Sequence, residues 1–305
     1  MNPSPIQFFL WLRWSNLLIV SLTLAVLRYG LIAPALAQEG LLLSMDSLSF
    51  VLLTLYTLIV TFSGYVINDI YDQKTDAQNK PRKQAIGVWI TEMRAKAIYL
   101  VLLLVGFLLA TYLDWNTDAT TYWIWIYLLM VFLLRLYSRN LKGSVLWGNV
   151  LVSLLCAAVI WIVPLAEKEA LLMLEDKRPL MFTLIFYTAF AALSNLLREI
   201  IKDAQDVEGD TKSGMKTLAV VYGPVASKKV ALAVAFVLLA CMFVFLIMDG
   251  RDGVKLSGFA VLTLPFLFLI HFGLLKNSEQ INWKSLSRMA KLLMLGGLLG
   301  LLFLL

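Results

Sequence analysis

The chain is poor in the residues that usually build disulfide frameworks and metal centres of soluble proteins. Its 305 residues include two cysteines, Cys156 and Cys241, and one histidine, His271, all within apolar runs. This placement argues against a disulfide framework or a thiolate metal site and favours packing roles. Charged residues make up 15% of the chain, against about 25% in a typical soluble domain. The scarcity of charge excludes an ordinary soluble domain.

Long apolar runs take the place of those residues. The chain is 60% hydrophobic, with a mean hydropathy of +0.81. A transmembrane helix needs about 20 apolar residues, so the sequence predicts an all-α, polytopic membrane bundle that forms one domain over residues 1–305. Nine transmembrane helices are predicted, at 6–30, 46–70, 94–113, 119–137, 145–166, 180–201, 226–248, 254–275 and 285–305.

The basic residues predict how the bundle is oriented. The net charge of +6 is spread between the apolar runs rather than gathered on one module, so nucleic acid is not expected as a partner. Of the 26 Lys and Arg residues, twenty fall on one side of the predicted membrane. The other six are Arg28, Lys168, Lys177, Arg178, Arg251 and Lys255. The positive-inside rule therefore predicts a cell-membrane protein with a cytoplasmic N-terminus and an outside C-terminus.

The same acidic pattern occurs twice, each time at the end of an apolar run. Asp69, Asp72 and Asp76 have the same spacing as Asp203, Asp206 and Asp210, and Asp203 follows Asp69 by 134 positions. Offsets of three and seven place carboxylates on one face of a helix. Clustered carboxylates at membrane depth repel each other unless cations join them. Mg²⁺ prefers carboxylate and phosphate oxygens, so the pattern predicts an enzyme that acts on a diphosphate at the cytoplasmic side.

The two motifs are not identical copies. Asn68 lies four residues before Asp72, where an amide oxygen and a carboxylate can share one Mg²⁺. Lys202 holds the equivalent position before Asp206, and a charged lysine cannot bind Mg²⁺. Lys202 is therefore expected to contact the diphosphate instead.

The paired motifs resemble those of the UbiA-type intramembrane prenyltransferases, over nearly the whole chain. Asn68, Asp72 and Asp76 are similar to the first aspartate-rich motif of that family, and Asp206 and Asp210 to the second. Weaker likenesses are Arg13-Trp14-Ser15-Asn16, with Trp14 where the family usually has proline, and the segment 137–142. Residues 198–210 and 214–218 look most like the branch that prenylates geranylgeranylglyceryl phosphate.

The resemblance implies transfer of a polyprenyl group from a polyprenyl diphosphate to a lipophilic acceptor, in an enzyme that also contacts membrane lipid. It implies Mg²⁺ ligands at Asn68, Asp72, Asp206 and Asp210, and catalytic or supporting roles for Asp69, Asp76, Asp203 and Lys202. Phosphate or diphosphate groups would be bound by Arg13, Asn16, Lys80, Lys83, Lys142, Arg198, Lys212 and Lys216. The predicted cytoplasmic side carries more cations than one diphosphate requires, namely Arg13, Lys80, Arg82, Lys83, Lys142, Arg198, Lys202, Lys212 and Lys216. Either the acceptor carries a second phosphate, or these residues simply follow the positive-inside rule.

Two other functions remain open at this point. An aromatic prenyltransferase of quinone or tetrapyrrole biosynthesis would share much of the pattern. A cation-coupled membrane transporter would also need carboxylates in the membrane, although here they cluster at helix ends with lysines rather than through the bilayer.

Overall fold

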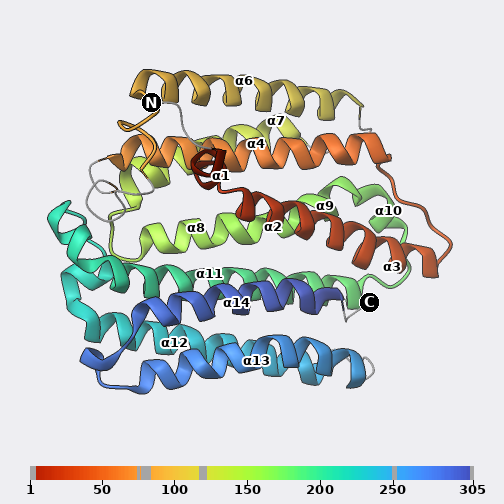
Figure 1. Ribbon diagram of the computed structural model, residues 1–305. Helices are drawn as coiled ribbons and strands as arrows, with labels where there is room; N and C mark the ends of the chain where they lie inside the picture. Colours follow the sequence, from red (N-terminus) through yellow and green to blue (C-terminus); the bar gives the residue numbers. More distant parts are fainter. Residues whose placement is uncertain (1–4, 74–75, 77–83, 117–121, 249–252, 303–305) are drawn as a thin grey trace.

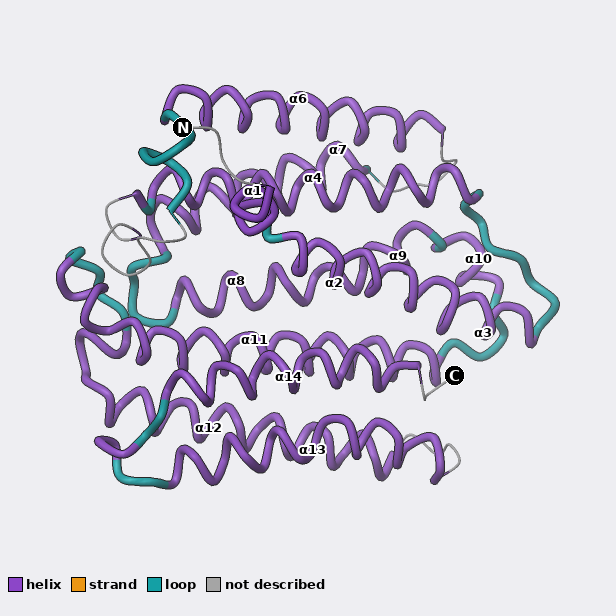
Figure 2. Tube along the Cα trace, in the orientation of Figure 1, coloured by secondary structure: helices purple, strands orange, loops and turns teal. Residues whose placement is uncertain are grey.

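The computed structural model describes residues 5–73, 76, 84–116, 122–248 and 253–302, and these are almost entirely helical (Figures 1 and 2). The α-helices are α1 (Pro5–Leu12), α2 (Trp14–Ala25), α3 (Ala33–Gln38), α4 (Ser47–Tyr71), α6 (Glu92–Asn116), α7 (Trp123–Leu136), α8 (Trp147–Ala158), α9 (Ile162–Ala166), α10 (Lys168–Met173), α11 (Arg178–Lys212), α12 (Leu218–Met248), α13 (Gly253–Leu275) and α14 (Trp283–Leu301). The π or 3₁₀ segments are η1 (Val26–Ile32), η2 (Tyr137–Leu141), η3 (Val159–Trp161) and η4 (Ser278–Gln280).

Eight helical stretches in the described part of the chain are long and apolar enough to cross a membrane. They are Trp14–Gln38, Ser47–Tyr71, Glu92–Asn116, Trp123–Leu141, Trp147–Ala166, Arg178–Lys212, Leu218–Met248 and Gly258–Leu275. The prediction of an all-α polytopic bundle is confirmed. The ninth predicted crossing corresponds to α14, which is helical but carries Lys284, Arg288 and Lys291 in its first half. A ninth crossing stays a prediction.

The first span begins later than the predicted range 6–30, because Arg13 breaks the helix. Arg13 has φ 52° and ψ 41°, the left-handed region that residues with a side chain seldom adopt. This turn separates α1 from α2 and moves the span to Trp14–Gln38. Arg28, which the charge count assigns to the outer side, lies within this span, and its side chain is 2% exposed.

The helix α11 also differs from its predicted range, since it continues beyond residue 201 to Lys212. It ends in a Schellman motif at Gly214, whose φ is 73°. The Met215 N–H donates to the Asp210 carbonyl at 2.9 Å, and the Gly214 N–H donates to the Thr211 carbonyl at 3.1 Å. The second acidic motif is helical throughout, and the chain turns back directly after it.

The long helix α11 lies at the centre of the packing, against α8, α12 and α14 (Figure 1). The ring of Phe186 on α11 stacks on Phe245 of α12, with centroids 3.7 Å apart. Helix α14 approaches α13 closely, because a Cβ at Gly296 would lie 2.1 Å from the Leu262 carbonyl oxygen. A second group of helices, α2, α6 and α7, packs against α4.

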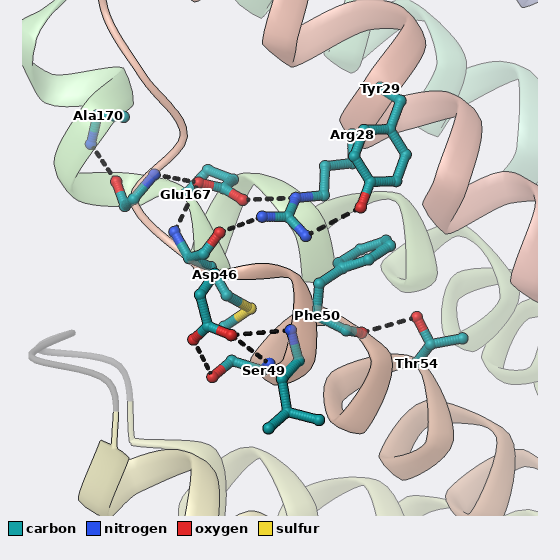
Figure 3. Close-up of polar contacts among 11 residues, drawn as sticks. Arg28, Tyr29, Asp46, Ser49, Phe50, Thr54, Glu167 and Ala170 are labelled. Carbon is teal, nitrogen blue, oxygen red and sulfur yellow. Dashed lines mark hydrogen bonds and ion pairs between the residues drawn. The ribbon is translucent and has the colours of Figure 1, made fainter.

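The C-terminal ends of α4 and α11 lie at the same end of the bundle, at the left of Figure 1. This end, called the motif end below, therefore brings the two acidic motifs together. At the opposite end, Glu167 is fully buried and its Oε1 lies 2.9 Å from the Arg28 Nε (Figure 3). The Glu167 Oε2 accepts hydrogen bonds from the Ser44 and Met45 N–H groups at 2.6 and 3.2 Å. Through these hydrogen bonds Glu167 holds the α3–α4 loop against the α9–α10 junction.

Candidate active site

The first acidic motif occupies the last turn of α4 and the residues that follow it. Asp72 is the C-cap residue of α4 and is 4% exposed. Its Oδ2 accepts a hydrogen bond from the Asn68 Nδ2 at 2.6 Å. The Asp76 N–H donates to the Asp72 carbonyl at 2.8 Å, which continues the helical turn. A carboxylate at a helix C-terminus faces the negative end of the helix dipole, so Asp72 requires a cation beside it.

Arg13 and Asn16 reach the same helix from the N-terminal segment. The Arg13 Nη2 lies 2.5 Å from the Asp69 Oδ1, and its guanidinium lies 4.6 Å from the centre of the Tyr65 ring. Asn16 donates through its Nδ2 to the Tyr65 hydroxyl at 3.3 Å. The left-handed turn at Arg13 thus delivers its cation to the first motif, and the strain of that turn occurs beside a candidate site.

The second acidic motif lines a polar cavity through Asp203, Asp206 and Asp210. Asp203 is oriented by Asn149 of α8, whose Nδ2 donates to the Asp203 Oδ2 at 2.8 Å. Glu199, one turn earlier on α11, contacts Arg198 and lies 3.2 Å from the Lys202 Nζ. Glu199 therefore holds Lys202 in the lining of the cavity.

Lys142 joins the two motifs. It lines the cavity and forms an ion pair with Asp72. Burial and the repulsion of Lys202 and Arg13 lower the pKa of Lys142, while Asp69 and Glu199 act in the opposite direction. The loop that carries Lys142 is attached to the α11–α12 loop, because the Lys216 N–H donates to the Gly143 carbonyl at 2.8 Å.

The structure brings most of the predicted residues together. The cavity has a free volume of about 40 Å³, enough for about three water molecules. Its lining consists of Asp76, Tyr137, Lys142, Asn149, Glu199, Lys202, Asp203, Asp206, Asp210, Met215 and Thr217. Asp72, with its partner Asn68, connects to the cavity through the ion pair with Lys142. Arg13 pairs with Asp69, three residues before Asp72.

Two of the predicted phosphate-binding lysines, Lys212 and Lys216, do not line this cavity. Lys212 is exposed and pairs with Glu208, with their charged atoms 2.6 Å apart. Lys216 is exposed, and its backbone N–H makes the contact described above. Lys80 and Lys83 lie outside the described residues.

The sequence pattern assigned no role to five residues of the lining, namely Tyr137, Asn149, Glu199, Met215 and Thr217. Glu199 could have been found, because it lies three residues before Lys202 on the same helix face. Asn149 and Thr217 carry no such local signal, since their neighbours in the site come from other parts of the chain.

The donor set suits Mg²⁺, although its carboxylates are not gathered into a ligand cage. Among the described residues, no three His, Cys, Asp or Glu side chains are close enough to hold a metal ion. However, the buried Oδ1 of Asn68 has no hydrogen-bond partner within the described chain, and it lies on the amide that contacts Asp72. The site groups named above include seven carboxylates and four cations. Because the carboxylates outnumber the cations, an anionic substrate would bind here only with added positive charge, which a divalent cation can supply.

The sequence is similar to one family of known proteins. The sequence profile of the UbiA prenyltransferase family matches residues 18–295. The chain is 35% identical to the digeranylgeranylglyceryl phosphate synthase of Methanopyrus kandleri over 68% of this chain and 69% of the relative. It is 31% identical to that of Korarchaeum cryptofilum over 80% and 81%, and 31% identical to that of Methanoregula boonei over 86% and 84%.

Solved structures show the same fold. A structure of digeranylgeranylglyceryl phosphate synthase in membranes aligns with a TM-score of 0.65 at 21% identity, over 97% of this chain and 98% of that one. A UbiA homologue from Archaeoglobus fulgidus, bound to DMAPP and Mg²⁺, aligns with a TM-score of 0.64 at 17% identity, over 98% and 100%.

Proposed function

The chain belongs to the UbiA prenyltransferase family, and we propose that it makes an ether lipid by prenylating geranylgeranylglyceryl phosphate. It is a multi-pass membrane enzyme that transfers a prenyl group, so the transporter hypothesis is set aside. The acceptor is proposed because three relatives at 31 to 35% identity are digeranylgeranylglyceryl phosphate synthases. The expected surplus of cations supports it less, since Arg13, Lys142 and Lys202 already pair with carboxylates.

The observation that carries the proposed chemistry is the cavity in which Asp203, Asp206 and Asp210 meet Lys142 and Lys202. Asn68, Asp72, Asp206 and Asp210 would hold Mg²⁺, which when bound offsets the charge on the leaving diphosphate. Lys142 and Lys202 donate charge-assisted hydrogen bonds to the diphosphate oxygens. Asn149 fixes Asp203 and Glu199 fixes Lys202, so that these groups need little reorganisation when charge develops.

The reaction breaks the bond between the prenyl C1 and the diphosphate oxygen. The hydroxyl oxygen of the acceptor bonds to C1, and its proton goes to the diphosphate, which leaves. Tyr137 is an aromatic residue in the described lining of the cavity, and an aromatic ring there would stabilise positive charge on the allylic carbon. We place the cavity at the cytoplasmic side, where soluble diphosphates are available, on the basis of the twenty basic residues counted above.

One purified preparation in detergent tests the acceptor. It is supplied with Mg²⁺, geranylgeranyl diphosphate and equal concentrations of geranylgeranylglyceryl phosphate, 4-hydroxybenzoate and a naphthoate, and products are identified by mass spectrometry. We expect the ether lipid as the main product. Prenylated aromatic product without ether lipid would reject the acceptor and leave prenyl transfer intact.

A further inference from the structure

Thr217 has a buried hydroxyl group that nothing in the described chain uses. The residue is 2% exposed, and its Oγ1 has no hydrogen-bond partner among the described residues. A buried hydroxyl left unpaired is destabilising. A buried polar group without a partner in the protein calls for an explanation, and a bound ion, water or ligand is one such partner. Since Thr217 lines the polar cavity, a bound molecule in that cavity is the available partner.

The surrounding backbone aims Thr217 at the cavity. The Schellman motif at Gly214 turns the chain back from the end of α11. The Lys216 N–H then binds the Gly143 carbonyl at 2.8 Å, so two loops are joined. Lys142 precedes Gly143 and Thr217 follows Lys216. One backbone hydrogen bond therefore positions both Lys142 and Thr217 in the same lining.

The Thr217 hydroxyl does not cap α12, the helix that follows it. A threonine before a helix usually accepts a backbone N–H through its side chain. Here the Val220 and Val221 N–H groups donate to the Thr217 carbonyl at 3.1 and 3.0 Å, and the side chain takes no part. The Thr217 carbonyl therefore accepts the first hydrogen bonds of the helix, and the Thr217 hydroxyl can bind another partner.

We propose that Thr217 is a substrate-binding residue whose hydroxyl donates a hydrogen bond to a phosphate oxygen held by Lys142 and Lys202. The cations of the lining select an anion, and an oxygen acceptor suits a hydroxyl donor. The phosphate belongs either to the prenyl diphosphate or to a phosphorylated acceptor. This inference rests on the proposed function, because prenyl transfer brings both groups to this cavity.

Thr217→Val tests it, because valine keeps the branched shape and removes the hydroxyl. The apo variant should unfold at the wild-type temperature or above, since an unpaired buried group has been removed. Its dissociation constant for geranylgeranyl diphosphate with Mg²⁺, or for geranylgeranylglyceryl phosphate, should rise about tenfold, as expected for losing a hydrogen bond to a charged group. The affected ligand identifies which phosphate Thr217 binds. Thr217→Ser keeps the hydroxyl and should bind both ligands as wild type does.

Thr263→Val is the matched control. Thr263 is fully buried in α13, and its Oγ1 donates to the Phe259 carbonyl at 2.8 Å. Neither dissociation constant should change in this variant. Unchanged binding of both ligands by Thr217→Val would overturn the inference, and so would a lower unfolding temperature or failure to fold. Because binding is measured without turnover, loss of the ether-lipid product alone would count against the proposed function and not against Thr217.

Discussion

Lys142 and Asp72 form an ion pair between residues 70 positions apart in the chain. The pair places an ammonium group on a carboxylate that we propose as a Mg²⁺ ligand. It also accounts for the burial of Asp72 at the C-terminal end of α4, where the helix dipole disfavours negative charge. Lys142 and the metal therefore compete for one carboxylate, and arrival of metal would free Lys142 to bind a phosphate.

Lys142→Gln should separate these two effects. Without the ammonium group, Mn²⁺ used as a probe should bind on the order of tenfold more tightly, because a competing charge is removed. Geranylgeranyl diphosphate should bind about tenfold more weakly, because a charge-assisted hydrogen bond is lost. Electron paramagnetic resonance measures free Mn²⁺ directly. Lys96→Gln, which removes an exposed cation paired with Glu92 on α6, should change neither quantity.

If Lys142→Gln bound Mn²⁺ no better than wild type, Lys142 would not compete with the metal for Asp72. The ion pair would then be a permanent part of the site.

Asp72→Ala and Asp206→Ala should each lower prenyl transfer by about a hundredfold or more. The reason is that each removes one carboxylate from a site that must gather positive charge around a diphosphate. Glu208→Ala is the control, since Glu208 lies on the same helix as Asp206 with its side chain 84% exposed. Turnover is measured on protein that elutes as wild type on gel filtration. Near wild-type turnover of either aspartate variant would remove that residue from the metal site.

The spans were the most predictable part of this structure. The predicted range 46–70 matches Ser47–Tyr71 to within one residue, because one uninterrupted apolar run fixes the helix and Asp46 caps it. The Asp46 Oδ1 accepts the Leu48 and Ser49 N–H groups at 2.8 and 3.0 Å. The break in the helix at Arg13 could not be predicted, because a basic residue in an apolar run does not indicate a backbone φ of 52°.

The site was predictable only in part. The spacing of the aspartates predicted that both motifs belong to one site, and the structure places them at one end of the bundle. The contacts of Lys142 with Asp72 and of Asn149 with Asp203 join distant segments, which no local pattern specifies. Thr217 depends on a turn and a loop-to-loop hydrogen bond. The metal and phosphate roles of individual residues stay predictions.

Glu167→Ala should destabilise the protein by about 3–5 kcal/mol, because it leaves the buried Arg28 without its ion-pair partner. Replacing both, as Arg28→Met with Glu167→Leu, should recover much of this loss by removing the buried charges together. Thermal unfolding in lipid nanodiscs gives the measurement. Glu169→Ala, at an exposed position of α10, should unfold as wild type does. Equal stability of Glu167→Ala and wild type would show that the pair in Figure 3 contributes little.

The motif end of the bundle should face the cytoplasm. The basis for this orientation is that twenty of the 26 basic residues fall on that side. Glu208 marks the motif end, and Asp176, before α11, marks the opposite end; both side chains are exposed. In a variant with Cys156 and Cys241 replaced by alanine, each position is changed to cysteine in turn. An impermeant maleimide should label Asp176→Cys in intact cells and Glu208→Cys after lysis. The reverse pattern would invert the topology and place the acidic motifs outside, away from soluble diphosphates.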